Sequence, residues 1–299
     1  MLAAFAAEPV VTSAFAEASS ALGYDLWSIV QNGPESRLNS TDCTQPAMLA
    51  AGIATWRLWR ERGGGAPAVV AGHSLGEFTA LVVAGALEFG AAVELVQLRG
   101  CLMQRAVPAG EGAVAAILGL SDDEVAAACA EAAQGEVVEP ANYNSPAQVV
   151  IAGAKAAVER AIEAAKGRGA KRAVLLPVSV PVHSSLMRPA AEEFAEALKG
   201  VKITPPGIDY ISSVDAQAYA DAESIRELLG RQLASPVRWT DTVRALSVYH
   251  IGQIIECGPG KVLTGLNRRS ERRADTLVLS LDDPESMERV RTATLAAHV

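Results

Sequence analysis

Apolar runs alternate along this chain with segments whose apolar residues recur at helical spacing. The run from Ala68 to Ala71 is apolar throughout, as in a parallel strand that is covered on both faces. Helices are predicted around it, over 47–60, 75–84 and 91–105. The segment 251–269 repeats the order of apolar strand, glycine turn and helix. This alternation predicts an α/β fold with a parallel, α/β-hydrolase-like core.

The pattern changes in the middle of the chain, where short strands flank two helices. The predicted elements are a strand over 112–120, a helix over 122–133, two strands within 137–153, a helix over 155–167 and a strand over 172–182. This βαββαβ order is the ferredoxin-like pattern. We therefore predict a small ferredoxin-like subdomain of residues 109–183, inserted into a large α/β domain of residues 1–108 and 184–299.

Composition narrows the class of protein. The chain has 299 residues and a net charge of −8, and an acidic surface is unsuited to general binding of nucleic acid. Its four cysteines are dispersed, without the spacing of a metal site or a disulfide framework. No apolar run is long enough to span a membrane, and the first residues lack the basic start of a signal peptide. We expect a cytoplasmic monomer without cofactor, metal, nucleic-acid partner or membrane contact.

The segment Gly72-His73-Ser74-Leu75-Gly76 joins the apolar strand to the next helix and matches the G-x-S-x-G nucleophile elbow. Such a turn projects the serine hydroxyl from the backbone, so that Ser74 is a candidate nucleophile. The N–H of Leu75, at the start of the helix, is then a candidate oxyanion donor. The structural alternative is a tight glycine turn that happens to contain a serine.

A nucleophilic serine needs a base, and His183 is the best candidate because it follows a predicted strand in a loop. His73 adjoins the serine and should point away from it, His250 is expected to pack, and His298 lies in the tail. The carboxylates between Ser74 and His183 lie on predicted helices, and none follows a strand. This weakens the interpretation of the chain as a serine esterase.

Arg99 stands out because the helix that carries it is largely apolar, with Val96, Leu98 and Leu102 as neighbours. Burial of an uncompensated guanidinium is costly, so Arg99 should face an anion. The alternatives are a side chain that reaches the surface and one that pairs with a structural acid.

Six segments together resemble the malonyl-CoA:acyl carrier protein transacylases of type II fatty acid synthesis. The resemblance runs through essentially the whole chain, in the segments GHSLGEFTALVVAGAL, LRGCLMQ, NYNSPAQVVIAG, PVHSSLM, QLASPVRW and ECGPGKVLTGL. It implies transfer of a malonyl group from malonyl-CoA to the phosphopantetheine thiol of acyl carrier protein, through a seryl ester in a ping-pong reaction. Malonyl-CoA and acyl carrier protein would then be its partners, in fatty acid biosynthesis.

The resemblance also implies roles for individual residues. Ser74 would be the nucleophile and His183 its base, while the backbone carbonyl of Gln232 would orient His183 in place of a carboxylate. Arg99 would hold the free malonyl carboxylate bidentately, which suits the planar guanidinium. Acetyl-CoA lacks this carboxylate and would leave Arg99 desolvated and unpaired.

Other family features are matched less completely. Asn142 and Asn144 correspond to an asparagine-bearing hairpin that would line the pocket, and Leu75 would supply one oxyanion donor. Family members begin with a strand that ends in a Phe-Pro-Gly-Gln-Gly-Ser-Gln loop, whose glutamine supplies the second donor. We find no such loop in this sequence, and the loss of one donor typically costs about 100–1000-fold in rate. We therefore expect weak activity.

Basic residues are the candidates for binding an acidic carrier protein. They are Lys166, Arg168, Lys171 and Arg172 in the inserted unit, and Arg268, Arg269, Arg272 and Arg273 after the last predicted helix.

Two alternatives to malonyl transfer stay open at this point. One is a serine esterase or thioesterase, and the other is a truncated, catalytically impaired member of the family.

Overall fold

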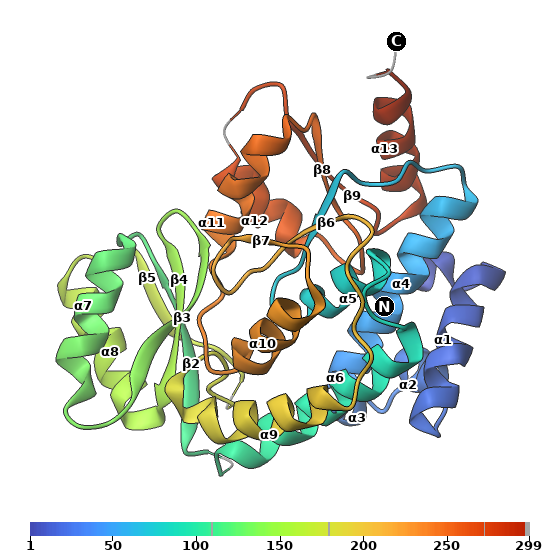
Figure 1. The fold of residues 1–299 in the computed structure, drawn as a ribbon. Coiled ribbons are helices and arrows are strands. Elements are labelled where there is room, and N and C mark those ends of the chain that lie inside the picture. Colours follow the sequence, from blue (N-terminus) through green and yellow to red (C-terminus); the bar gives the residue numbers. More distant parts are fainter. Residues whose placement is uncertain (109, 179, 272, 297–299) are drawn as a thin grey trace.

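The computed structural model describes residues 1–108, 110–178, 180–271 and 273–296 (Figure 1). Helices form the N-terminal part. They are η1 (Ala3–Phe5), α1 (Pro9–Leu22), α2 (Leu26–Asn32), α3 (Glu35–Leu38) and α4 (Thr41–Glu61). Helix α4 begins earlier than predicted and contains Pro46 within it, so that proline does not mark its first turn.

Parallel strand pairs lie at the centre of the part of the molecule outside the inserted unit. Strand β1 (Val69–Ala71) pairs in parallel with β6 (Asp209–Ile211), and β6 pairs antiparallel with β7 (Ala218–Tyr219). Strand β8 (Gln253–Glu256) pairs in parallel with β9 (Leu277–Ser280). The predicted parallel pairing is therefore present, but among the described residues it is divided between two short sheets.

The main core lies among helices that pack against one another beside β1. Further helices of the larger part are α5 (Gly76–Val83), α6 (Phe89–Ala106), α9 (Arg188–Lys199) and α10 (Ala222–Gln232). Fully buried side chains from α1, α4, α5, α6 and α9 meet in one apolar cluster, among them Phe15, Leu49, Phe78, Val96 and Phe194. This cluster surrounds the start of α5 and so fixes the direction in which the serine turn points.

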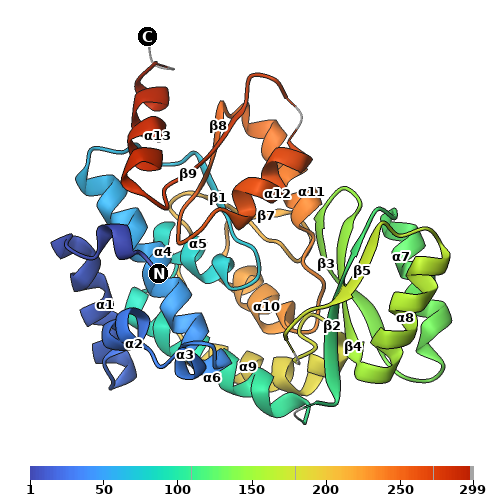
Figure 2. The same ribbon diagram turned by 180° about the vertical axis from the view of Figure 1, so that it is seen from behind.

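The inserted unit forms one antiparallel sheet with two helices on one face (Figures 1 and 2). Its elements are β2 (Gly112–Leu118), α7 (Asp122–Ala133), β3 (Val138–Ser145), β4 (Gln148–Ala154), α8 (Lys155–Gly167) and β5 (Arg172–Leu175). The strand order is β3-β4-β2-β5. Helix α7 begins with a capping box between Ser121 and Glu124, as its sequence suggested. Strand β5 is shorter than predicted, because Pro177 has no N–H with which to extend the ladder.

Backbone hydrogen bonds join the inserted unit to the loop after α10. The N–H of Tyr143 in β3 donates to the carbonyl of Val237 at 2.8 Å, and the N–H of Val237 donates to the carbonyl of Ala141 at 2.9 Å. The same loop continues into α11 (Trp239–Ala245) and η3 (Leu246–Tyr249). The remaining elements are η2 (Ser185–Met187), α12 (Val262–Ser270) and α13 (Pro284–Ala296). In the part of the chain that is described, no helix has the length and apolar character needed to cross a bilayer.

Candidate active site

The serine turn has the strained geometry of a nucleophile elbow. Ser74 has a φ of 51°, in the left-handed region that side-chain-bearing residues rarely adopt. A Cβ on Gly72 would lie 1.9 Å from the carbonyl carbon of Gly76, so only glycine fits where the strand end meets the helix start. A Cβ on Gly76 would meet no atom within 4 Å. The close approach of the two backbone segments therefore requires glycine at position 72 and not at position 76.

His183 lies against the serine. Its Nε2 is 2.7 Å from Ser74 Oγ, and its Nδ1 is 3.0 Å from the carbonyl oxygens of both Gln232 and Ser235. Two carbonyls can only accept, so Nδ1 carries the proton and donates it to them. Nε2 is then free to accept the hydroxyl proton of Ser74. The carbonyl of Ser235 is a second orienting group that the sequence did not indicate.

The environment keeps the imidazole neutral. His183 is 2% exposed, and burial, together with the nearby charge of Arg99, lowers its pKa to about 3. His73 points elsewhere, as expected, and its Nε2 lies 2.8 Å from Asn144 Oδ1 beside the ring of Trp239. His250 is exposed at the end of η3, so the expectation that it packs was wrong. His298 lies outside the described residues.

Arg99 reaches the serine from α6. The guanidinium is 2% exposed, and its Nη2 donates to Ser74 Oγ and to Gln232 Oε1, both at 3.0 Å. Its Nη1 donates to Gln45 Oε1 at 2.7 Å. Its buried Nε–H has no acceptor among the described residues. Burial lowers the pKa of Arg99 to about 10, which leaves the guanidinium charged at neutral pH.

The side chain of Gln232 has contacts that sequence reasoning did not anticipate. Its Nε2 donates to the carbonyl of Ser74 at 3.0 Å and to Glu77 Oε2, while its Oε1 accepts from Arg99. Glu77 is 1% exposed and lies in the first turn of α5. Glu77 and Gln45 are the site residues that we missed. The signal in the sequence was a charged or amide side chain in a predominantly apolar helix, as for Arg99.

The remaining predicted residues lie around the serine in different ways. Leu75 is the N-cap of α5, and its N–H has no acceptor in the described part of the chain, so it is available to an oxyanion. Asn144 Oδ1 accepts a hydrogen bond from His73 Nε2, and among the described residues its side chain forms no hydrogen bond with Ser74 or Arg99. Asn142 lies in β3, where its backbone forms a bridge with Val237 beside the loop that orients His183.

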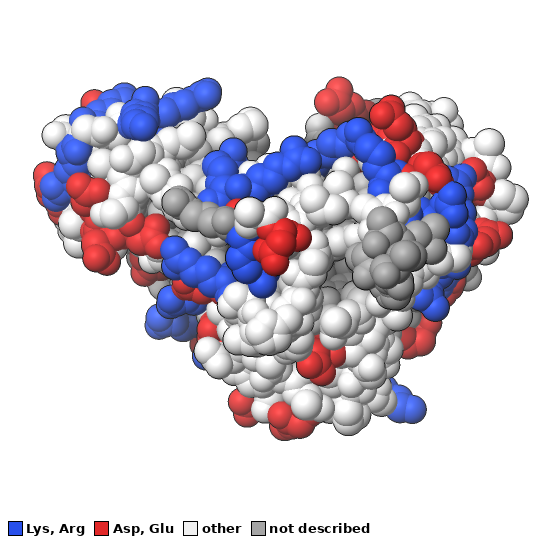
Figure 3. Space-filling view, turned by 90° about the horizontal axis from the view of Figure 1, so that it is seen from above, with Lys and Arg blue, Asp and Glu red and all other residues white. Residues whose placement is uncertain are grey.

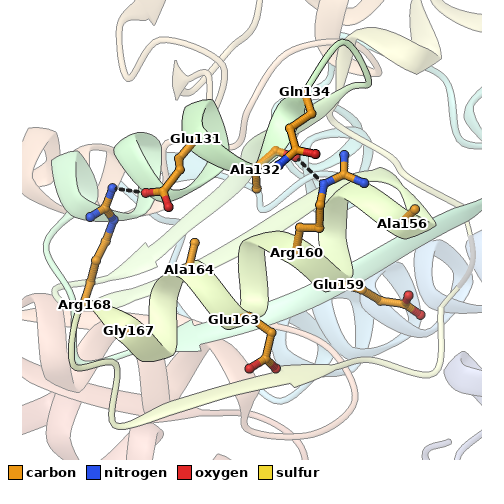
Figure 4. Close-up of a pocket in the computed structure, with 10 residues that line it drawn as sticks. All are labelled: Glu131, Ala132, Gln134, Ala156, Glu159, Arg160, Glu163, Ala164, Gly167 and Arg168. Carbon is orange, nitrogen blue, oxygen red and sulfur yellow. Dashed lines mark hydrogen bonds and ion pairs between the residues drawn. The ribbon is translucent and has the colours of Figure 1, made fainter.

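An open groove of about 880 Å³ lies away from the serine, between α7 and α8 on the inserted unit (Figure 4). Its two arginines already have partners, since Arg168 pairs with Glu131 at 2.6 Å and Arg160 donates to the carbonyl of Ala132 at 2.8 Å. We therefore regard it as a solvated seam. The described residues contain no group of His, Cys, Asp and Glu side chains that could hold a metal ion.

Basic side chains form a band across the upper face, interspersed with acidic ones (Figure 3). Several of the residues predicted to bind a carrier protein have partners within the chain. Lys166 pairs with Glu163, Arg168 with Glu131 and Arg273 with Glu271, and Arg269 donates to Gln148 Oε1. Lys171, Arg172 and Arg268 are exposed, and Arg272 lies outside the described residues. Their role in docking stays a prediction.

A serine, a neutral histidine and a buried arginine thus converge at one hydroxyl oxygen, and comparison with known proteins identifies the family. The family description "Acyl transferase domain" matches residues 3–295. The chain belongs to the acyl transferase family, among its malonyl-CoA:acyl carrier protein transacylases. It is an acyltransferase, which disfavours the esterase alternative.

Relatives cover nearly the whole chain. The malonyl CoA-acyl carrier protein transacylase of Escherichia coli strain K12 is 52% identical over 289 residues, which are 96% of this chain and 93% of that protein. The crystal structure of an acyl carrier protein S-malonyltransferase from Vibrio cholerae is similar with a TM-score of 0.93 and 54% identity, over 97% of this chain and 94% of that one. A third similar structure is a malonyl-transacylase in complex with its type II polyketide acyl carrier protein, with a TM-score of 0.95 and 51% identity, over 98% and 94% of the two chains.

Proposed function

We propose that this transacylase moves the malonyl group of malonyl-CoA to the phosphopantetheine thiol of an acyl carrier protein, through an ester on Ser74. The observation that carries the proposal is the position of Arg99, whose Nη2 lies 3.0 Å from Ser74 Oγ. A single methylene separates the carboxylate of a malonyl group from its thioester carbonyl. A guanidinium at hydrogen-bond distance from the nucleophile can therefore hold that carboxylate while Oγ attacks the carbonyl carbon.

The first half-reaction begins with the contact between Ser74 Oγ and His183 Nε2 at 2.7 Å. Nε2 takes the hydroxyl proton as Oγ bonds to the thioester carbon, and the carbonyl oxygen becomes an oxyanion. The free N–H of Leu75, at the start of α5, is placed to donate to that oxyanion. The carbon–sulfur bond then breaks, and the coenzyme A sulfur leaves with the proton from His183.

The second half-reaction uses the same groups in the reverse direction. His183 Nε2 takes the proton of the pantetheine thiol, and the sulfur attacks the ester carbonyl carbon. The bond between that carbon and Ser74 Oγ breaks, and Oγ recovers its proton from His183. Gln232 and Ser235 keep Nδ1 protonated throughout, because their carbonyls can only accept.

Arg99 also links substrate binding to the strength of the base. Its charge is the second largest cause, after burial, of the low pKa of His183. A bound malonyl carboxylate would neutralise that charge and raise the pKa of His183, which favours uptake of the serine proton. An acetyl group would leave the positive charge in place.

We propose that Asn144 acts in the site through His73, and that Asn142 holds the loop that carries Gln232.

The finer description of the fold belongs to the same proposal. We interpret residues 1–108 and 184–299 as a large domain with an α/β-hydrolase-like core, because β1 leads through the serine turn into α5. We interpret residues 109–183 as a ferredoxin-like subdomain, because its elements follow the βαββαβ order. The proposal needs no cofactor and places the enzyme in the cytoplasm, where the coenzyme A substrate would be available.

Intact-mass measurement after mixing with malonyl-CoA tests the proposal, with Ser74→Ala as the control. We expect a malonyl adduct on Ser74 that disappears when a holo acyl carrier protein is added and reappears on that protein. Rapid release to water would instead indicate hydrolysis, and the absence of an adduct would indicate a protein that has lost catalysis. The rate of adduct formation also tests the weak activity expected from the sequence.

A further inference from the structure

Glu77 is a buried carboxyl group that the catalytic steps above do not use. It follows Ser74 by three residues in the first turn of α5 and is 1% exposed. Its Oε1 accepts from the hydroxyl of Tyr210 and from the N–H of Ser213, both at 2.7 Å. Its Oε2 accepts from the side-chain amide of Gln232. Burial of a carboxyl group costs free energy unless it is compensated, so its place in the core calls for an explanation.

The contacts of Glu77 lead directly to Arg99. The amide of Gln232 lies between the two charged groups, with its Nε2 donating to Glu77 and its Oε1 accepting from Arg99 Nη2 at 3.0 Å. Within the described residues, the hydrogen bonds of Arg99 go to Gln45, Met103, Ser74 and Gln232 and none goes directly to Glu77. Because an ionised carboxylate and the carbonyl of Ser74 can both only accept, together they fix which way the amide of Gln232 points. The oxygen of that amide must then face the guanidinium.

Glu77 and Arg99 stand at the two ends of this series of hydrogen bonds and have opposite charges. The pKa of Glu77 is raised, because burial outweighs the hydrogen bonds from Ser213, Tyr210 and Gln232 that lower it. Burial lowers the pKa of Arg99, and the charge of Glu77 opposes that effect. The charge of Glu77 therefore offsets part of the desolvation cost of Arg99. The backbone N–H of Ser213 and the amide of Gln232 are fixed donors, which suit an ionised carboxylate.

We propose that Glu77 is the counter-charge of Arg99, held one amide away by Gln232, and that it acts as a positioning residue for recognition of the malonyl carboxylate. This inference rests on the proposed malonyl transfer. A carboxylate in direct contact with Arg99 would occupy the donors that the substrate needs. With no carboxylate nearby, the guanidinium would be buried without compensation, and only the carbonyl of Ser74 would hold the NH₂ group of Gln232 in place. Separation by one amide keeps Arg99 charged, oriented and open to a ligand.

The variant Glu77→Gln tests the proposal because it keeps the shape of the side chain and removes the charge. Its amide oxygen can still accept from Ser213 and Tyr210, which turns its NH₂ group toward the NH₂ group of Gln232. Two donors cannot pair, so the NH₂ group of Gln232 should keep only the carbonyl of Ser74 as an acceptor, and its amide should hold Arg99 less firmly. We expect kcat/KM for malonyl-CoA to fall by about 30-fold and that for acetyl-CoA by less than about 3-fold.

A double-mutant cycle with Arg99→Ala separates this role from a general loss of folding. If Glu77 acts through Arg99, adding Glu77→Gln to Arg99→Ala should change the preference for malonyl over acetyl by less than about 2-fold. Glu77→Asp keeps the charge and withdraws it from Gln232, so it should lose less of the preference than Glu77→Gln. This second variant keeps the test available if Glu77→Gln does not fold.

Glu256→Gln is the matched control for the loss of a partly buried carboxylate. Glu256 accepts from the N–H groups of Leu263 and Thr264 at the start of α12, outside the site. The variant Glu256→Gln should leave the preference for malonyl over acetyl unchanged. Equal losses for both acyl groups in Glu77→Gln, or additive effects in the cycle, would overturn the role of Glu77. If the unsubstituted chain forms no malonyl ester, the proposed function itself fails, and the two outcomes are distinct.

Discussion

Replacement of Arg99 by alanine should reverse the choice between malonyl and acetyl groups. In the structure, the guanidinium is 2% exposed and has one buried N–H without an acceptor, close to a serine hydroxyl to which another of its N–H groups donates. A malonyl carboxylate would pair with it in a desolvated site. Loss of one partner of such a pair typically costs 2–5 kcal/mol, and we take about 3 kcal/mol for the transition state.

This energy corresponds to a decrease of about 100-fold in kcat/KM for malonyl-CoA. Acetyl-CoA has no carboxylate to lose, so its kcat/KM should stay the same or rise. A rise is expected because removal of the Arg99 charge raises the low pKa of His183 and makes it a better base. Arg99→Lys keeps the charge without the planar fork, and it should lose about 10-fold for malonyl-CoA.

The assay is the rate of ester formation on Ser74, followed by rapid quench and intact mass with each thioester. Arg99→Ala leaves the side-chain oxygens of Gln45 and Gln232 without their donor, so we expect a loss of about 1–3 kcal/mol in the free energy of unfolding. Thermal unfolding should therefore be measured in parallel, to confirm that the variant is folded. An equal decrease for malonyl and acetyl groups in the folded variant would refute a carboxylate clamp.

Three further predictions follow from the site and its supports. Because His183 has a pKa of about 3 in the free enzyme, kcat/KM for malonyl-CoA should stay flat from about pH 7.5 to about pH 5, and an acid limb near pH 6.5 would contradict this. Gly72→Ala should cost about 3 kcal/mol or more in stability because its Cβ meets backbone, whereas Gly76→Ala should not destabilise. Denaturant unfolding measures both. Ser121→Ala removes the capping box with Glu124 and should cost about 1 kcal/mol by the same assay, without changing kcat.

The sequence predicted those elements whose ends carry local signals. Helix α7 begins at Asp122 because Ser121 caps it, and helix α8 spans 155–167 as its periodicity indicated. Strand β9 and helix α13 were not predicted, since their short or polar segments lack a strong period. The division of the parallel strands between two sheets also has no local signal, because pairing joins segments far apart in the chain.

The candidate site could likewise be predicted only where local sequence signals exist. The serine turn was visible because glycine, serine and glycine stand together between a strand and a helix. Arg99 was visible because a charge interrupts an apolar helix. Glu77 satisfied the same criterion, but its partners Tyr210, Ser213 and Gln232 lie more than a hundred residues away in the sequence. Only the fold brings them together.

The two carbonyl groups that orient His183 have a consequence for the choice of acceptor. A carboxylate at that position would carry a full negative charge and strengthen the imidazole, whereas carbonyls offer only dipoles. The hydroxyl of Ser74 is held 2.7 Å from this weak base, but an incoming group is not, so the base removes a proton readily only from an incoming group that is fairly acidic. A thiol ionises near pH 8.5 and bulk water only at 15.7, a gap of about seven pKa units. The loop of Gln232 and Ser235 thus favours sulfur over oxygen, and the ester can persist in the presence of solvent until a thiol arrives.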